Sequence, residues 1–301
     1  MGLLAEIQAE IEARSLSHGG WAVKDRSRAS IETTSYAVMA LAGDQEVVRR
    51  SAIDALLRTQ NDDGSWPAFE GDDQEGCWTT SLALIALRFV GSSARPFERG
   101  ERWLLNNKGR EGHWFWKWKF RTVDRAVQFD PEKYGWPWFP ETVSWVIPTA
   151  FALIALRQSF HSRITEEVLD RVQIGNEMLR DRACPQGGWN AGNGIVFGSA
   201  LIPHIDSTAI ALLALIDDAD PTAARGCEWL RQATADCASA FSLAWAVVAF
   251  LIHHDQAVDA CIAKLLKALG SKRISSNVET ISLAAIALKA ADGDAIPFRS
   301  A

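Results

Sequence analysis

A histidine and an aspartate, His204 and Asp206, stand two residues apart at the start of a long apolar run in the stretch HIDSTAIALLALI (204–216). Aspartate and serine commonly cap helices, so Asp206 and Ser207 could have a purely structural role. A carboxyl group beside a histidine, at the edge of an apolar environment, could instead be reactive. A cationic histidine would favour the carboxylate, whereas a neutral one could orient the acid by a hydrogen bond. His204 and Asp206 are therefore the candidate catalytic residues.

The apolar run after Asp206 is one copy of a short repeat. Every copy has alanine at its fourth position, a small residue at its seventh and a large apolar residue at its eighth. The six copies cover residues 34–41, 80–87, 149–156, 208–215, 243–250 and 281–288. A helix that is apolar nearly all round is an interior helix, and the alanines allow neighbouring helices to approach closely. We therefore expect six buried inner helices.

An amphipathic helix or a Gly-Trp turn precedes most copies, so the repeating unit is an outer helix, a turn and an inner helix. The ends of successive copies are 46, 69, 59, 35 and 38 residues apart. An open solenoid usually keeps a more uniform repeat length. The pattern predicts an all-α fold, the α/α toroid, with six helical hairpins and an inner barrel of six helices within an outer barrel of six. We expect a single domain over 1–301, with the first outer helix at 3–13 and a tryptophan-rich insertion at about 108–140.

All inner helices of such a ring point the same way, so their N-termini converge at one end of the central cavity. One set of residues stands two positions before the copies of the repeat: Glu32, Trp78, Ile147, Asp206, Phe241 and Glu279. We expect these residues to line the mouth of the cavity. The acids among them could also simply complement the helix dipoles, at roughly 0.3–1 kcal/mol each.

Tryptophan is strongly over-represented, since the chain has 13 tryptophans and only 2 tyrosines. In HWFWKWKF (113–120) aromatic and basic residues partly alternate, which predicts an extended segment lying over the mouth. Aromatic faces could line a pocket and stabilise a carbocation, and Lys117, Lys119 and Arg121 could hold a diphosphate. The tryptophan-rich turns could equally well brace a long loop. The candidate substrate-binding residues are Trp78, Trp114, Trp116, Trp136, Trp138, Glu141, Trp145, Trp189, Phe241 and Glu279.

Two motifs resemble those of squalene-hopene and oxidosqualene cyclases. QNDDGSW (60–66) is similar to the QxxxGxW core of their QW motif. The segment from GGW (187–189) to HIDSTA (204–209) resembles the segment that leads to their DxDDTA box. The resemblance puts Asp206 at the middle position of this box and implies that it is the proton donor of a class II terpene cyclase. A histidine and a serine replace the other two acids of the box.

The resemblance extends over nearly the whole chain as a repeat and includes the prenyltransferase β-subunits. The zinc-ligating aspartate, cysteine and histidine of those subunits have no counterpart in this sequence, so we expect no metal site. The resemblance also implies no cofactor, apart from Mg²⁺ if the substrate carries a diphosphate.

Three functions fit these features. The first is a terpene cyclase-like protein that handles an isoprenoid and starts its cyclisation by protonation, with Asp206 as general acid. The second is a carbohydrate-active α/α toroid enzyme, which needs two carboxylates roughly 5–10 Å apart; Asp206 would then pair with Glu141 or Glu279. The third is a non-catalytic toroid that binds a lipid or a protein partner, and a filled ring centre would favour it.

The composition excludes several other functions. The net charge is −6 and no long basic block occurs, so nucleic-acid binding is not expected. Five scattered cysteines without a CxxC pair are typical of reduced thiols in the cytoplasm. No apolar run approaches the ~20 residues that span a bilayer, so we expect a soluble protein. Peripheral membrane contact, a protein partner and a homo-oligomer remain open.

Overall fold

The computed structural model describes residues 2–23, 28–43, 46–72, 75–92, 95–123, 128–159, 165–216, 221–271 and 277–299. Within these ranges the regular secondary structure is helical apart from one short β-hairpin, β1 (Ile195–Val196) and β2 (Ser199–Ala200), and two isolated β-bridges. The inner helices are α2 (Ile31–Ala40), α4 (Thr79–Phe89), α7 (Val146–Gln158), α9 (Ile205–Ala214), α11 (Ala240–Ile252) and α13 (Val278–Ala291). The outer helices are α1 (Leu3–Ala13), α3 (Glu46–Arg58), α5 (Arg95–Asn106), α8 (Glu166–Asp181), α10 (Pro221–Ala233) and α12 (Val258–Ser271).

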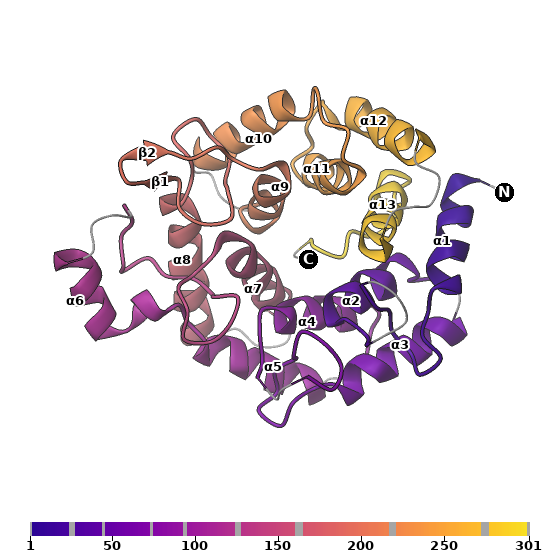
Figure 1. The fold of residues 1–301 in the computed structure, drawn as a ribbon, viewed down its shortest axis with the longest axis horizontal. Helices are drawn as coiled ribbons and strands as arrows, with labels where there is room; N and C mark the ends of the chain where they lie inside the picture. The colour runs from indigo at the N-terminus through magenta and orange to yellow at the C-terminus, as the bar shows by residue number, and fades with distance from the viewer. Residues whose placement is uncertain are drawn as a thin grey trace.

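The inner helices form a closed ring (Figure 1). Each packs against the next inner helix along the chain, and α13 packs against α2, which closes the circle. The outer helices surround this ring, and each packs mainly against the inner helix that precedes it in the chain, while α1 packs against α13. The predicted all-α toroid, with six inner and six outer helices, is confirmed for the described residues.

The inner helices are buried because the repeat gives them apolar or small side chains on every face. In α11, for example, residues 243–250 are all buried. Side-chain oxygens of Ser30, Ser239 and Asn277 accept hydrogen bonds from backbone N–H groups in the first turns of α2, α11 and α13. These caps satisfy amide groups that have no partner within a helix.

Four tryptophans brace the outer helices against the inner ones. Their indole N–H groups each donate to a carbonyl two residues before the end of an outer helix, at 2.6–2.8 Å. The four pairs are Trp21 with Ile11, Trp66 with Leu56, Trp136 with Leu104, and Trp189 with Leu179. Carbonyls in the last turn of a helix lack an intrahelical partner, so each indole satisfies one of them inside the core.

The backbone N–H of each of these tryptophans donates to a threonine of the following inner helix, at 2.9–3.0 Å. The threonines are Thr34, Thr80, Thr149 and Thr208. All four stand at the first position of the sequence repeat, and the two copies that begin with leucine or isoleucine are not preceded by such a tryptophan turn. Tryptophan is therefore used in these turns because one residue both fills the core and ties two helices together.

The insertion leaves this brace unchanged. In three of the braces the carbonyl and the tryptophan are 10 residues apart, whereas Leu104 and Trp136 are 32 residues apart. The additional residues contain a 3₁₀ turn, η1 (Arg110–Gly112), and the helix α6 (Trp114–Thr122), which projects from the ring (Figure 1). The ring thus accommodates extra chain at a turn without a change in its own geometry.

The prediction of an extended segment at 113–120 is wrong, because most of that stretch forms α6. A spacing of four residues explains the helix. Trp116 and Phe120 stack with ring centroids 6.0 Å apart, and Lys117 and Arg121 both bind Glu132, at 2.5 and 2.8 Å. Side chains four residues apart share a helix face, whereas they would be far apart along a strand.

No helix among the described residues combines the length and the hydrophobicity that a membrane span requires.

Candidate functional site

The N-terminal ends of the inner helices carry one layer of partly exposed side chains. These are Glu32, Trp78, Ile147, Asp206, Phe241 and Glu279, each at or next to the first turn of its helix. Because all inner helices run in the same direction around the ring, this layer lies at one end of it. We call this end the mouth.

One helical turn deeper, a second layer of side chains is buried. Its members stand four residues after those of the mouth and occupy the third position of the repeat: Tyr36, Leu82, Phe151, Ile210, Trp245 and Leu283. Trp245 lies 5.9 Å from Tyr36 and 5.9 Å from Phe151, measured between ring centroids. Since α11 is not a neighbour of either α2 or α7 in the ring, these side chains meet at its centre.

An aromatic path connects the mouth to this centre. Trp138, from the loop before α7, contacts Trp78 edge-on at 5.1 Å, and Trp78 lies 5.7 Å from Phe151. On the other side of the ring, Phe241 lies 6.5 Å from Trp245. The faces of these rings offer an apolar surface with negative quadrupole potential, which attracts cations.

Two carboxyl groups come together where the ring closes. Glu32 lies in the first turn of α2 and Glu279 in the first turn of α13, and these helices pack against each other. The Thr33 hydroxyl donates a hydrogen bond to Oε1 of Glu279 at 2.7 Å. Burial raises the pKa of Glu32 from 4.5 to about 8, and the negative charge of Glu279 adds to this effect. Burial also raises the pKa of Tyr36, one turn below, and the charges of the two glutamates contribute.

A pKa of about 8 favours the protonated form of Glu32 at neutral pH. This neutral acid lies beside a negatively charged partner and above a buried phenol. Sequence reasoning gave Glu32 a place at the mouth but did not single it out, because its partner is 247 residues away along the chain.

The two predicted catalytic residues do not form a pair. His204 is the N-cap of α9; its side chain is exposed and makes no capping hydrogen bond, while its backbone N–H donates to the Trp189 carbonyl at 2.8 Å. Asp206 is partly exposed in the first turn of α9, where no other described residue forms a hydrogen bond or ion pair with its side chain. At the same level the neighbouring helices α7 and α11 carry Ile147 and Phe241.

An open groove of about 610 Å³ lies beside the start of α9. It is lined by Trp145, by the hairpin that contains β1 and β2, and by His204. Phe197 and Ile202 of this hairpin region are strongly exposed, at 81% and 76%. His204 and Trp145 thus share a groove at the edge of the mouth.

The other predicted substrate-binding residues lie elsewhere. Trp136 and Trp189 are buried within the braces, with both their N–H groups hydrogen-bonded, so their placement does not support a contact with a ligand. Trp114 is exposed on α6, and the cationic groups of Arg110 and Lys119 lie 4.8 and 4.6 Å from the ring centroid of Trp116. Glu141 is exposed in a turn with a positive φ of 61°. Of the predicted set, Trp78, Trp138, Phe241 and Glu279 lie at the mouth together with Glu32.

Four aromatic residues of the centre were missed by the sequence analysis: Tyr36, Phe151, Trp245 and Phe298. The first three could have been found, because they occupy the third position of the repeat, one helical turn below the mouth layer. Phe298 lies outside the repeat and has no such signal. Among the described residues, no group of three or more His, Cys, Asp or Glu side chains is arranged to hold a metal ion.

The fold is similar to that of several solved enzymes. A variant of the type II terpene cyclase MstE from Scytonema, in complex with merosterolic acid A, superposes with a TM-score of 0.64 at 15% identity, over 96% of both chains. ent-Copalyl diphosphate synthase from Streptomyces platensis gives a TM-score of 0.57 at 17% identity, over 86% of this chain and 50% of the other. A GH76 α-mannanase from Bacteroides thetaiotaomicron gives 0.64 at 10% identity, over 97% and 96%.

No protein-family model matches the sequence, and no curated protein is similar to it. At identities of 10–17% the structural similarity establishes the α/α toroid that terpene cyclases and some glycoside hydrolases share.

Proposed function

We propose that this protein binds an isoprenoid at the mouth of its inner ring and cyclises it after protonation of a double bond, with Glu32 as the proton donor. The position of Glu32 beside Glu279, in the layer that also carries Trp78 and Phe241, is the observation that carries this proposal, and burial there raises the pKa of Glu32 to about 8. An acid can protonate an alkene only if it holds its proton at the working pH. Most carboxyl groups in proteins are ionised at pH 7, so a partly buried carboxyl group that keeps its proton, in the same layer as Trp78 and Phe241, is suited to this reaction.

The surroundings of Glu32 favour the cation that protonation would create. The edges and faces of Trp78 and Phe241 lie at the same level of the ring, and each cation–π contact contributes roughly 0.5–2 kcal/mol. The negative charge of Glu279 also lies next to the donor. The layer below the mouth is apolar except for the Tyr36 hydroxyl and the indole N–H of Trp245. Such a layer suits a hydrocarbon chain.

The resemblance to terpene cyclases points to Asp206 as the donor, and this residue stays the second candidate. Its side chain is partly exposed and lacks a partner among the described residues. The neighbouring helices bring it Ile147 and Phe241, so no second carboxyl group lies beside Asp206 in the way that Glu279 lies beside Glu32.

Product analysis tests the proposal directly. The purified protein is incubated with farnesyl, geranylgeranyl and squalene-type substrates, with and without Mg²⁺, and cyclic products are sought by gas chromatography with mass spectrometry. We expect Glu32→Gln to lower the rate by 10²–10⁴-fold, which is the usual contribution of a general acid. We expect Asp206→Asn to have a much smaller effect, and the opposite order would return the donor role to Asp206.

The pH profile gives a second test. The rate should fall about tenfold per pH unit once the pH exceeds the pKa of Glu32, about 8, because only the protonated form reacts. A rate that rises through this range would exclude Glu32 as the acid.

One observation favours a non-catalytic function instead. Tyr36, Phe151, Trp245 and Phe298 fill the centre of the ring and are almost completely buried. A toroid that binds a lipid or a partner without chemistry needs no open chamber at this point. If every substrate is returned unchanged by a folded protein, this alternative replaces the cyclase.

A further inference from the structure

The helix α6 lies outside the ring and is attached to it by one of its faces. Trp116 and Phe120, one turn apart, stack on each other, and the Phe120 ring packs against Phe129 at 5.0 Å between centroids. The Arg182 guanidinium, at the end of α8, lies over the Phe129 ring at 4.3 Å. These contacts define the attached face, so the opposite face of α6 points away from the ring.

The opposite face carries three exposed aromatic side chains, Trp114, Phe115 and Trp118. A helix turns about 100° per residue, so these three lie together, about half a turn away from Trp116 and Phe120. Their exposed fractions are 82%, 48% and 56%. Their rings lie 5.8–6.3 Å from neighbouring rings of the same helix. We call these three residues the aromatic face of α6.

Cations border the aromatic face on both sides. Lys119 lies at one edge and Arg121 at the other, because they follow members of the face by four and three residues. The helix has no acid, and two of its three basic residues, Lys117 and Arg121, share a single carboxylate, that of Glu132. The surface around the aromatic face is therefore positive, although the net charge of the chain is −6.

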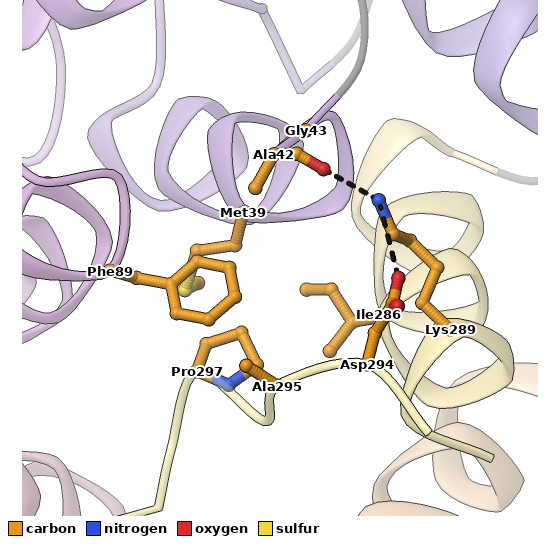
Figure 2. A pocket seen from close by; sticks show the side chains of 9 residues that line it. All are labelled: Met39, Ala42, Gly43, Phe89, Ile286, Lys289, Asp294, Ala295 and Pro297. Atoms are coloured by element: carbon orange, nitrogen blue, oxygen red, sulfur yellow. Dashed lines mark hydrogen bonds and ion pairs between the residues drawn. The ribbon is translucent and has the colours of Figure 1, made fainter. Parts of the chain in front are cut away.

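The apolar side chains at the end of the ring opposite the mouth offer no such surface. Met39, Phe89 and Pro297 help to line a pocket of about 250 Å³ there. Figure 2 shows them around a common space, with the Lys289 ammonium group at its edge, where it donates to the Ala42 carbonyl at 2.6 Å. These side chains face one another, whereas the aromatic face of α6 points into solvent.

The size of the aromatic face indicates which partner it fits. A helix of nine residues is ~14 Å long and ~10 Å wide, so its outer half offers roughly 200–300 Å². A stable protein partner usually buries ~800 Å² on each side. A lipid bilayer needs no such area, because its interface accommodates single tryptophan rings and its anionic headgroups attract lysine and arginine.

We propose that the aromatic face of α6 binds the surface of a lipid bilayer that contains anionic headgroups. Trp114, Phe115 and Trp118 enter the interfacial region, while Lys119 and Arg121 remain at the level of the headgroup phosphates. The proposal is independent of the proposed reaction, because α6 lies outside the ring and contributes no residue to the mouth.

Cosedimentation of the whole protein with lipid vesicles tests this binding. Two kinds of vesicle are compared, phosphatidylcholine alone and phosphatidylcholine mixed with phosphatidylserine. The variants are the double exchange Trp114→Ala with Trp118→Ala, and Lys119→Gln. The matched controls are Leu266→Ala and Lys267→Gln, two exposed residues of α12, which lies across the ring from α6 (Figure 1). Circular dichroism verifies that each variant is folded.

We expect the parent to bind the mixed vesicles, and to bind phosphatidylcholine alone more weakly. High salt should also weaken binding to the mixed vesicles, because it screens the charges. Loss of both tryptophan rings should lower the affinity ~10²-fold, about tenfold for each partly inserted ring. Lys119→Gln should lower it about fivefold, and it carries the test if the double variant does not fold. Both control variants should bind as the parent does.

Three results overturn the proposal. The first is a folded parent that binds neither kind of vesicle. The second is equal affinity for both kinds of vesicle, or binding that the α6 variants leave unchanged. The third comes from size-exclusion chromatography: a dimer of the parent that the double variant cannot form would assign the aromatic face to a second copy of the chain.

Discussion

Replacing Glu32 by glutamine should stabilise the folded protein in alkaline solution and have little effect in acid. The unfolded chain releases the Glu32 proton near pH 4.5, whereas the folded protein keeps it until about pH 8. The folded state therefore binds more protons between these values, and its stability falls as the pH rises through them. This contribution to stability is fully present below pH 4.5 and is lost above about pH 8.

The size of the effect follows from the two pKa values. The difference between 4.5 and about 8, at ~1.4 kcal/mol per pH unit, sets an upper limit of ~5 kcal/mol. Glu32 is partly in contact with solvent, which screens its charge, so we expect about half of this, ~2–3 kcal/mol. Glutamine is nearly the same size as protonated glutamate and cannot ionise. The variant should therefore keep this part of its stability as the pH rises.

Urea unfolding followed by circular dichroism, at about pH 5 and about pH 9, measures the difference. The parent should lose ~2–3 kcal/mol more than Glu32→Gln between these conditions. Glu279→Gln should reduce the loss without abolishing it, because burial, and not the charge of Glu279, is the main cause of the raised pKa. Asp206→Asn is the control, because Asp206 is a partly exposed acid of the same layer. This variant should lose as much stability as the parent between the two pH values. Parallel pH profiles for the parent and Glu32→Gln would refute the reasoning.

Two further predictions concern the braces. Thr80→Val should lower the free energy of unfolding, measured in urea, by ~1–3 kcal/mol. The exchange leaves the buried backbone N–H of Trp66, which donates to the Thr80 hydroxyl at 2.9 Å, without an acceptor. A loss below ~0.5 kcal/mol would mean that this hydrogen bond does not hold the turn. Gly226→Ala should lower the melting temperature, since its Cβ would lie 2.6 Å from the Trp189 ring, and overpacking of this kind costs ~1–3 kcal/mol. Gly270→Ala is its control, because nothing lies within 4 Å of a Cβ there, and a helix gains up to ~1 kcal/mol from this exchange. Equal effects of the two alanines would contradict the close packing of Gly226.

The sequence repeat predicted the fold because it reports burial directly. A helix such as α11, apolar on every face, can only be interior, and six of them with alanine at fixed positions can pack as a ring. The same repeat placed six residues at the mouth, since their position relative to the helix start is a local property. The two catalytic candidates came from a motif, and the motif alone could not show that His204 is exposed.

The Glu32 site could not be predicted in the same way. In the sequence, Glu32, Asp206 and Glu279 stand at equivalent positions of three repeat copies, and nothing local distinguishes them. Only closure of the ring makes α2 and α13 neighbours and separates Asp206 from both. Phe298 was missed for a related reason, because a residue outside every periodic segment gives no indication of where its side chain lies.

The closure of the ring also determines at which stage of folding Glu32 acquires its raised pKa. The hydrogen bond between Thr33 and Glu279 joins residues 246 positions apart, so almost the whole chain has to leave the ribosome before it forms. Contacts of such long range form late because the intervening loop has to be closed first. A nascent or partly folded chain therefore carries an ordinary, ionised carboxylate at position 32. If Glu32 is the proton donor that we propose, assembly of the ring itself produces the reactive form of the acid, and an incomplete molecule should not protonate an alkene.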